Sequence, residues 1–359
     1  MSRTQSFLCR TRLDRRWRLG LAAWAVALAG IFGASAPSRA DGSALGDAQM
    51  ADRAAALSRA AAAVVGVQTY AVDDARSNRT LGKQRAGSGV VISDDGLVLT
   101  IGYLILEAER VELVADDGRT VPARVVAYDV ATGFGLVQAL APLRIPPAPL
   151  AADSQPGDID TLMIVSGGED GAVSAARLAS RRAFSGYWEY HIDDALFTVP
   201  ARRDHSGAGL FDGRGRLLGV GSLFVADAAG SDGPRLPGNM FVPVDLLRPI
   251  IQELRARGTS KASARAWLGI NCVETGGMVH VVRVNDDSPA DVAGLQNGDR
   301  IVRIDGREVG ALAQLWKALW TGGAPEREVV LDILRAGEPQ QLKVFSVDRA
   351  KALRRAEGV

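Results

Sequence analysis

Short apolar runs separated by turn residues constrain the fold of this chain more than any other feature. Residues 90–92 and 97–99 are apolar, and the turn signal Asp94-Asp95-Gly96 lies between them. This arrangement predicts a β-hairpin in which Gly96 adopts a positive φ, because glycine has no Cβ to oppose it. The same pattern recurs at residues 111–114, 121–126 and 136–140. Many short strands at this spacing are typical of a β-barrel or a β-sandwich rather than a parallel α/β sheet.

A proline-rich connector, residues 142–149, leads to a second half that is also rich in predicted strands. These strands cover residues 161–165, 187–192, 195–199 and 217–224. Apolar residues then recur at helical spacing through residues 245–257, and Gly258 is suited to cap the end of that helix. An alanine-rich stretch, residues 48–65, predicts another helix ahead of the first strand.

A separate module begins at Arg265, beyond a small, polar linker at residues 259–264. Its predicted strands are again short and apolar, and they cover residues 268–273, 279–284, 301–304, 329–334 and 342–347. A short helix is expected after Ser288-Pro289-Ala290, and a longer one at residues 314–319. The chain therefore divides into a two-part β-rich body and a smaller β-rich module.

The N-terminus has the pattern of an export signal. An arginine cluster at residues 10–18 precedes an apolar run at residues 19–32, and Ser38-Arg39-Ala40 offers small residues at the positions that a signal peptidase reads. We therefore predict a signal peptide at residues 1–40. The apolar run is shorter than the roughly 20 residues that span a bilayer, so a cleaved signal is favoured over a retained membrane anchor. Arg15-Arg16 leaves both the general and the twin-arginine export routes open.

Charge and cysteine content exclude several classes of partner and site. With 42 Lys and Arg against 41 Asp and Glu, the formal net charge is +1, so the composition gives no sign of nucleic-acid binding. Cys9 leaves with the signal, so Cys272 cannot form an internal disulfide, and we expect it to be a small, buried hydrophobic residue. No metal-ligand spacing or phosphate-binding glycine loop is present in the sequence, and we expect no metal and no cofactor.

Three segments, taken in order, carry a resemblance to a known family. They are residues 87–92 (GSGVVI), 204–210 (DHSGAGL) and 241–245 (FVPVD). These segments resemble the HtrA-type (Do-like) periplasmic serine proteases, and the resemblance extends over residues 64–347. It implies a mainly β fold, in which a trypsin-like double β-barrel is followed by a PDZ domain, and it implies a periplasmic location.

The patterns and the resemblance together predict five regions. They are a signal peptide at residues 1–40, an N-terminal lead-in at 41–62, a trypsin-like domain at 63–258, a PDZ domain at 265–348 and a basic C-terminal tail at 349–359. The first region is removed on export if the signal is cleaved.

Ser206 matches the nucleophile of that family, but the residues that would activate it do not match. A serine hydroxyl needs a general base, and a third group must orient that base. By the resemblance, the histidine position falls three residues after Thr100, at Tyr103, and the aspartate position falls at Gly133. A phenol with a reference pKa of about 10 stays protonated at pH 7, and glycine has no side chain. Asp204 stands where the family has a glycine of its oxyanion hole.

The three histidines of the chain do not offer a substitute base. His205 is adjacent to Ser206, so the two side chains point apart, and His280 lies in the second module. His191 is expected to be a structural residue of a strand. Because loss of the base alone costs about a millionfold in turnover, we expect Ser206 to be a vestigial nucleophile in a catalytically degenerate member of the family.

The second module carries the most specific part of the resemblance. Residues 265–270 (RAWLGI) resemble the carboxylate-binding loop of HtrA-type PDZ domains, and residues 288–306 follow the pattern of the domain. Such a loop presents backbone N–H groups to the terminal carboxylate of a peptide, which adds as a strand to the neighbouring sheet edge. The resemblance therefore assigns peptide binding to Trp267, Leu268, Gly269 and Ile270.

Three functions are compatible with these features. The first is a non-catalytic protein that binds exposed polypeptide C-termini or unfolded proteins as a chaperone, adaptor or regulator. The second is a serine endopeptidase of periplasmic protein quality control that uses Ser206 with a non-standard or partner-supplied base. The third is a structural subunit that forms a homo-oligomer or assembles with active relatives. The departures at Tyr103, Gly133 and Asp204 favour the first.

Overall fold

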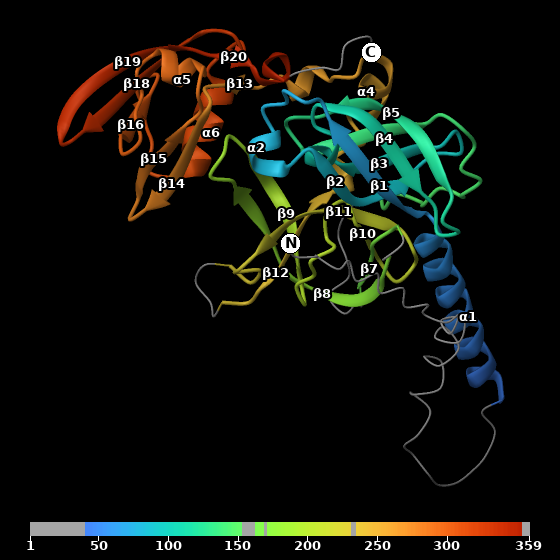
Figure 1. Ribbon diagram of the computed structural model, residues 1–359. Coiled ribbons are helices and arrows are strands. Elements are labelled where there is room, and N and C mark those ends of the chain that lie inside the picture. Colours follow the sequence, from blue (N-terminus) through green and yellow to red (C-terminus); the bar gives the residue numbers. More distant parts are fainter. Residues whose placement is uncertain (1–39, 153–161, 169–170, 231–234, 354–359) are drawn as a thin grey trace, which may run out of the picture. The chain divides into compact units, whose positions relative to one another are not determined.

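The computed structural model describes residues 40–152, 162–168, 171–230 and 235–353 (Figure 1). The predicted signal peptide lies outside the described residues except for Ala40, and so does the tail from residue 354 onward. The chain divides into two units, Met1–Ala48 and Gln49–Val359. Helix α1 (Ala40–Ala62) is the first described element and confirms the helix predicted in the alanine-rich stretch. None of the helices in the described ranges combines the length and the apolar character of a membrane span.

Six antiparallel strands close the first barrel. They are β1 (Val64–Ala71), β2 (Gln84–Val91), β3 (Leu97–Ile101), β4 (Ala108–Val114), β5 (Thr120–Tyr128) and β6 (Phe134–Ala139), which pair in the order β1-β2-β3-β6-β5-β4. The predicted hairpin is confirmed, because β2 pairs with β3 and Gly96 between them has a φ of 80°. Helix α2 (Asn78–Leu81) lies between β1 and β2, and α3 (Gly102–Ile105), which carries Tyr103, directly follows β3.

Six further strands close the second barrel. They are β7 (Leu162–Val165), β8 (Val173–Ser185), β9 (His191–Val199), β10 (Gly209–Phe211), β11 (Leu217–Val225) and β12 (Gly238–Pro243), in the order β10-β11-β12-β9-β8-β7. The barrel strand predicted at residues 187–192 is wrong for residues 187–190, which lie outside the barrel strands and connect β8 to β9. Their aromatic residues favour strands by composition, but here Trp188 and Tyr190 stack on each other with ring centroids 5.7 Å apart.

Two other sequence predictions need correction in this barrel. The long strand β8 is missed, because most of its residues are half-buried or exposed and no strict apolar alternation marks it. The helix predicted at residues 245–257 is split into the 3₁₀ turn η2 (Val244–Leu246) and α4 (Ile251–Arg257). Pro249 lies between the two pieces, and its ring and missing N–H interrupt a helix. Gly258 caps α4 in the left-handed conformation, as predicted.

The second module is a separate sheet with two helices. A six-stranded arrangement is built from β14 (Ile270–Thr275), β15 (Met278–Val284), β16 (Arg300–Ile304), β17 (Arg307–Glu308), β18 (Glu328–Arg335) and β19 (Glu338–Phe345). A two-stranded sheet joins β13 (Ala266–Trp267) to β20 (Val347–Asp348), and the helices are α5 (Pro289–Val292) and α6 (Leu312–Thr321). Short 3₁₀ turns, η3 (Lys261–Ser263) and η4 (Arg349–Ala352), flank the module.

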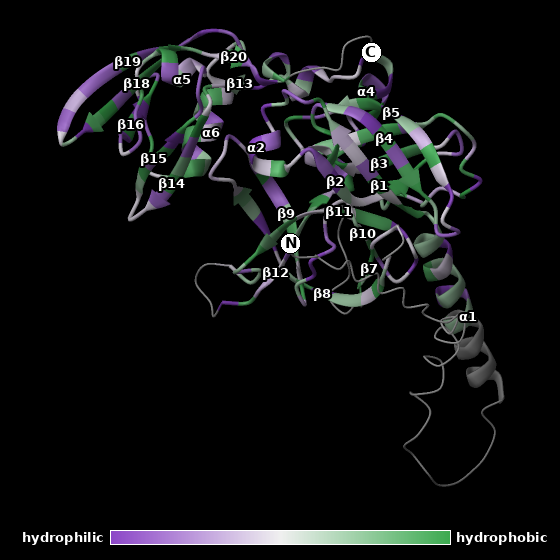
Figure 2. Cartoon of the chain, in the orientation of Figure 1, coloured by the Kyte–Doolittle hydropathy of each residue, from purple (hydrophilic) through white to green (hydrophobic). Residues whose placement is uncertain are grey.

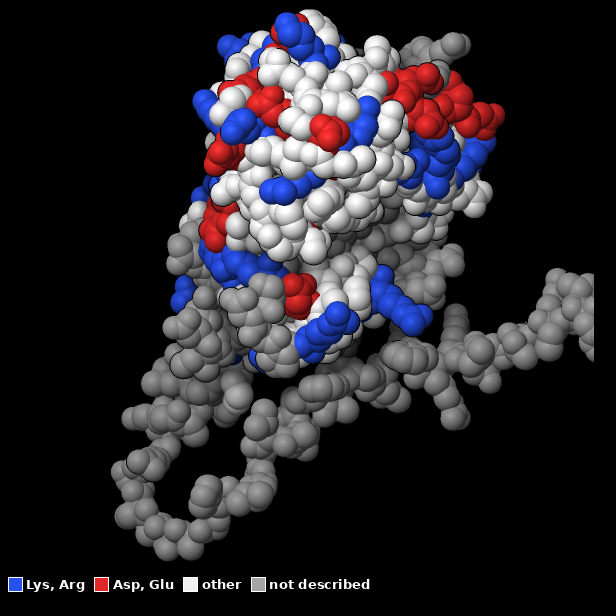
Figure 3. Space-filling model, turned by 90° about the vertical axis from the view of Figure 1, so that its left-hand side faces the viewer, with Lys and Arg blue, Asp and Glu red and all other residues white. Residues whose placement is uncertain are grey.

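Most buried apolar side chains of the two barrels form one core that spans both barrels, a smaller cluster lies within the second barrel, and the second module has a core of its own. In Figure 2 the hydrophobic segments run along the strands of both parts. Trp316 on α6 is fully buried in the second core, and Cys272 on β14 is buried there as predicted. The face shown in Figure 3 carries acidic and basic side chains with uncharged surface between them, so neither sign of charge dominates it.

A buried guanidinium holds the segment that carries Tyr103. The Nη1 atom of Arg85 donates to the backbone oxygens of Tyr103 at 3.0 Å and Leu106 at 2.6 Å, and its Nη2 atom donates to Ser77 Oγ at 2.7 Å. Burial lowers the pKa of Arg85, and the nearby Glu107 carboxylate opposes that shift. Arg85 thus ties the segment of α3 to β2.

We predict that Arg85→Met lowers the free energy of unfolding by about 3 kcal/mol. The substitution removes the donor to two buried carbonyls and the cation beside the buried Glu107. Urea unfolding of the full chain measures the effect. Lys83→Met, which removes an exposed ion pair with Asp73, is the matched control and should leave the midpoint unchanged. Equal midpoints for all three proteins would contradict the structural role of Arg85.

Candidate functional site

The turn that carries Ser206 lies between the two barrels. The backbone oxygen of Ser206 accepts a hydrogen bond from the Ser88 N–H of β2 at 2.8 Å, and the Gly207 N–H donates to Gly221 of β11 at 2.9 Å. Gly207 has a φ of 74°, and a Cβ there would lie 1.9 Å from the Ser88 oxygen. Only glycine fits this position, so the resemblance around the serine reflects a tight backbone geometry.

The Ser206 hydroxyl faces a phenol. Tyr103 Oη lies 2.8 Å from Ser206 Oγ and 2.8 Å from the backbone oxygen of Ser222 on β11. Tyr103 has one proton to donate, and the Ser222 carbonyl can only accept. Both contacts are satisfied together when Tyr103 donates to Ser222 and the Ser206 hydroxyl donates to Tyr103. In this arrangement the serine proton points at the Tyr103 oxygen, which is already protonated and does not take up a second proton.

The phenol cannot act as a general base at neutral pH. Burial raises the pKa of Tyr103 to about 12, although its hydrogen bond with Ser206 opposes the shift. At pH 7 about one phenol in 10⁵ is therefore ionised. Tyr103, which the resemblance aligns with the family's histidine, is a structural hydrogen-bonding group in this fold.

Gly133 fills the aspartate position with a conformation that disfavours a side chain. It has a φ of 81°, and a Cβ there would lie 3.2 Å from Tyr190 Oη. The backbone oxygen of Gly133 accepts the Gly102 N–H at 2.7 Å, which joins it to the start of α3. Tyr190 Oη in turn donates to the Thr132 oxygen at 2.7 Å. These backbone and phenol contacts surround Gly133, the position that the resemblance aligns with the family's aspartate.

The histidines are all engaged away from the serine. His205 donates from Nδ1 to the Arg202 oxygen at 3.0 Å, and burial lowers its pKa. His191 Nδ1 lies 2.8 Å from Ser185 Oγ, and its Nε2 lies 3.1 Å from Asp193 Oδ1. His280 belongs to β15. No hydrogen bond joins any of these three rings to Ser206 within the described part of the chain.

Asp204 is held by a cation. Arg202 Nε donates to Asp204 Oδ1 at 2.9 Å, and the Ser166 hydroxyl donates to Oδ2. Burial alone would raise the pKa of Asp204, but the hydrogen bonds from Arg202 and Ser166 outweigh it and hold the pKa below its usual range. Asp204 is therefore a weak base, and its charge lies two residues before the serine.

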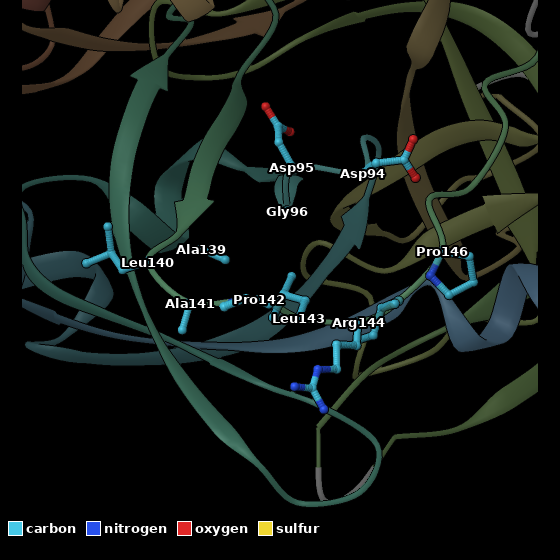
Figure 4. A pocket seen from close by; sticks show the side chains of 11 residues that line it. Asp94, Asp95, Gly96, Ala139, Leu140, Ala141, Pro142, Leu143, Arg144 and Pro146 are labelled. Carbon is cyan, nitrogen blue, oxygen red and sulfur yellow. The ribbon is translucent and has the colours of Figure 1, made fainter.

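Two surface hollows lie on the first barrel, and only the smaller one contains Ser206. A hollow of about 250 Å³ reaches Ser206 and is lined by Leu81, Gln84, Arg85, Ala86, Tyr103, Leu104 and Ser206, with no carboxylate or imidazole among them. A larger hollow of about 640 Å³ is formed by residues 94–96 and 139–146 of the first barrel, and Figure 4 shows Asp94, Asp95 and Arg144 around it. The larger hollow contains none of the predicted site residues, so its size does not make it the reactive centre.

The predicted carboxylate-binding loop lies between β13 and β14. Leu268 and Ile270 are buried, Trp267 pairs with Val347 of β20, and Gly269 has a φ of 85°. A Cβ on Gly269 would lie 2.2 Å from the Ser288 Cβ, so glycine is required there. The strand predicted at residues 268–273 accordingly begins only at Ile270 and extends to Thr275.

The loop holds a carboxylate from the same chain. The N–H of Leu268 donates to Glu189 Oε1 at 2.6 Å, and the N–H of Gly269 donates to the same atom at 3.2 Å. Glu189 is 3% exposed, and burial raises its pKa to about 7 although Arg349 and the loop N–H groups favour the charged form. Sequence reasoning missed Glu189; the only signal was a lone acid among the aromatic residues of a predicted strand.

The described residues give no metal site, since no group of three or more His, Cys, Asp or Glu side chains among them could hold an ion. Burial raises the pKa of the Cys272 thiol, which makes it a poor metal ligand and a poor nucleophile.

Two domain families match the chain. The trypsin-like peptidase domain matches residues 87–220, and the PDZ domain matches residues 266–345. The chain is 25% identical over 335 residues to "Serine endoprotease DegS" of Haemophilus influenzae, covering 90% of this chain and 95% of that protein. It is 24% identical over 275 residues to "Probable periplasmic serine endoprotease DegP-like" of Brucella suis. That match covers 72% of this chain and 52% of the relative, so the chain spans about half the length of the DegP-like relatives it matches.

Solved structures share the fold. The structure titled "HtrA-type protease AlgW with decapeptide" matches with a TM-score of 0.52 at 21% identity and covers 83% of this chain and 98% of that one. A serine endoprotease from Yersinia pestis matches with a TM-score of 0.51 at 21% identity, covering 88% of this chain and 99% of that one. The domain matches show a trypsin-like peptidase domain followed by a PDZ domain, and the chain is similar in sequence to serine endoproteases of the HtrA type, whose fold it shares.

Proposed function

We propose that this protein is an HtrA-type pseudoprotease that binds exposed polypeptide C-termini or unfolded proteins without cleaving them. The observation that carries the proposal is the 2.8 Å contact between Ser206 Oγ and Tyr103 Oη, which fills the place of the general base with a protonated phenol. Loss of that base costs about a millionfold in turnover. At Gly133, the positive φ and the tight contact that a Cβ would make with Tyr190 disfavour the orienting carboxylate as well.

The proposal also assigns a role to each region of the chain and a cellular location to the protein. In it, residues 1–40 direct export to the periplasm, residues 63–258 form the inactive trypsin-like body, and residues 265–348 supply the peptide site through Trp267, Leu268, Gly269 and Ile270. The export pattern at the N-terminus and the word "periplasmic" in the name of the Brucella relative support the location. The N–H groups that meet a carboxylate support the peptide site.

An active endopeptidase is the second candidate. The names of the Haemophilus and Brucella relatives describe endoproteases, and Ser206 remains at the edge of a hollow that a substrate could reach. In this reading a partner or a second copy supplies the base, so assembly into an oligomer would be required for activity. A purely structural subunit, the third function considered above, would likewise act by assembling with catalytically complete relatives.

We predict that a fluorescent organophosphonate probe does not label Ser206. The probe reports an activated serine, and here the hydroxyl donates to a phenol that cannot take its proton. Labelling of the wild type and of Ser206→Ala, compared by intact-protein mass spectrometry, measures the effect, and casein turnover should likewise be equal in the two proteins. Stoichiometric labelling that Ser206→Ala abolishes would decide for the endopeptidase.

We predict that Tyr103→Phe destabilises the protein without changing proteolysis. It removes the donor to the buried Ser222 oxygen and the acceptor of Ser206, and we expect a loss of about 1.5 kcal/mol in the free energy of unfolding. Tyr70→Phe, which keeps the ring beneath the Arg110 guanidinium, is the control and should unfold like the wild type. A Tyr103→Phe variant as stable as the wild type would argue against the bridging role of the phenol.

A further inference from the structure

The connection between β8 and β9 lies along the open edge of the PDZ sheet. Strand β14 is the terminal strand of that sheet, with β15 on its other side. The Cys272 N–H of β14 donates to the Tyr187 oxygen at 2.7 Å, and Trp188 forms an antiparallel bridge with Asn271. Residues 187 and 188 therefore extend the sheet as an added strand, which is the way that an extended peptide binds to a sheet edge.

The added segment has the direction of a peptide that presents its C-terminus. Residue 187 pairs at Cys272 and residue 188 at Asn271, so the chain runs toward the loop at Leu268 and Gly269. At that loop the Glu189 side chain accepts the two backbone N–H groups. The side-chain carboxyl of Glu189 thus lies where the terminal carboxylate of a bound peptide would lie.

Helix α6 contacts the same segment from the other side. Trp316 Nε1 donates to the Gly186 oxygen at 3.0 Å, and Lys317 forms an ion pair with Asp193 of β9 at 2.5 Å. Because Trp316 is fully buried, its indole N–H depends on the Gly186 oxygen as its acceptor. Residues 186–189 are therefore bonded to both sides of the groove, β14 and α6, and to the loop at its end.

We propose that residues 186–189 are an internal ligand that occupies the peptide groove of the PDZ domain, so that a peptide with a free C-terminus must displace them. This inference rests on the proposed peptide-binding function of the same groove. A ligand on the same chain acts at a high effective concentration, of the order of mM for a short connection. An outside peptide binds only those molecules in which the groove is free, so its apparent affinity is the intrinsic affinity multiplied by the free fraction.

Hydrogen exchange in the full chain tests the occupancy directly. We expect Glu189→Ala to speed exchange of the Leu268, Gly269 and Cys272 amides by at least about tenfold, because the internal ligand then spends more time released. The matched control is Asp194→Ala, which removes an exposed carboxylate from β9, the strand that follows this connection, and should leave these amides as in the wild type. Unchanged exchange in Glu189→Ala overturns the proposal. Equal acceleration in both variants also overturns it, because the effect would then not depend on the groove.

Peptide binding separates this inference from the proposed function. The probe is a fluorescein-labelled peptide with an apolar last residue and a free carboxylate, with its C-terminal amide as the negative control, and the readout is fluorescence polarisation. We expect Glu189→Ala to bind it at least about tenfold more tightly than the wild type does. Equal affinity overturns the internal ligand and leaves peptide binding standing. Absence of binding in both proteins, together with faster exchange in Glu189→Ala, supports the internal ligand and rejects the proposed function.

The affinity for the peptide should also depend on pH. The pKa of Glu189 is raised from 4.5 to about 7 in the groove, so the docked form takes up a proton that the released form does not. Docking of residues 186–189 is then strongest below pH 4.5, where Glu189 is protonated in both forms. It weakens as the pH rises from 4.5 toward 7, because the released form has ionised while the docked form still holds its proton. Above pH 7 both forms are ionised, and docking no longer changes with pH. The groups whose fields reach this carboxyl are Arg349 from η4 and the Cys272 thiol from β14, and burial raises the pKa of that thiol.

We therefore expect the affinity of the wild type for the peptide to rise about tenfold between pH 5.5 and pH 7.5. Glu189→Gln keeps a carbonyl oxygen for the two loop N–H groups but cannot ionise, so its affinity should stay constant over this range. A rise of the same size in Glu189→Gln would mean that another group titrates, and it would count against the internal ligand.

Discussion

The hydroxyl of Tyr103 joins the two barrels at the point where a protease of this fold does its chemistry. It bridges Ser206 on the connecting turn and the Ser222 oxygen of β11, while its own helix is held by Arg85 of β2. A catalytic imidazole has to be free to move a proton, whereas this phenol is buried and has both of its hydrogen-bonding roles filled. Tyr103 therefore acts as a structural link between the two barrels, and the turn that carries Ser206 is tightly constrained at Gly207.

In the second domain, the backbone N–H groups of the predicted carboxylate-binding loop meet a carboxyl group of the same chain. Backbone N–H groups need no particular side chain, so a carboxylate-binding loop survives wherever its glycine geometry does. Here Leu268 and Gly269 meet Glu189, and the β14 edge meets residues 187 and 188. Tyr190, one residue further on, contacts the Thr132 oxygen beside Gly133. The groove and the serine site therefore share one short stretch of the second barrel.

Much of the fold and part of the candidate site could be predicted from the sequence. The features that could not be predicted were hidden for physical reasons. The hairpin at Gly96 and the glycine at 269 were predictable, because positive φ leaves a local signature. The substitutions at positions 103 and 133 were visible once the resemblance aligned them. Strand β8 was missed because both of its faces are largely solvated, and Pro249 was overlooked as a break in a helix. Glu189 was beyond reach, because its partners lie about eighty residues away and only the folded chain brings them together.

The strand that residues 187 and 188 add to β14 has a consequence for any attempt to study the second domain alone. A fragment that begins after the linker lacks this strand, and β14 becomes a bare edge with unpaired N–H and C=O groups. Bare edges recruit other chains. Such a fragment would capture peptides, and copies of itself, more readily than the intact protein does, and its behaviour would overstate what the domain does in its natural setting.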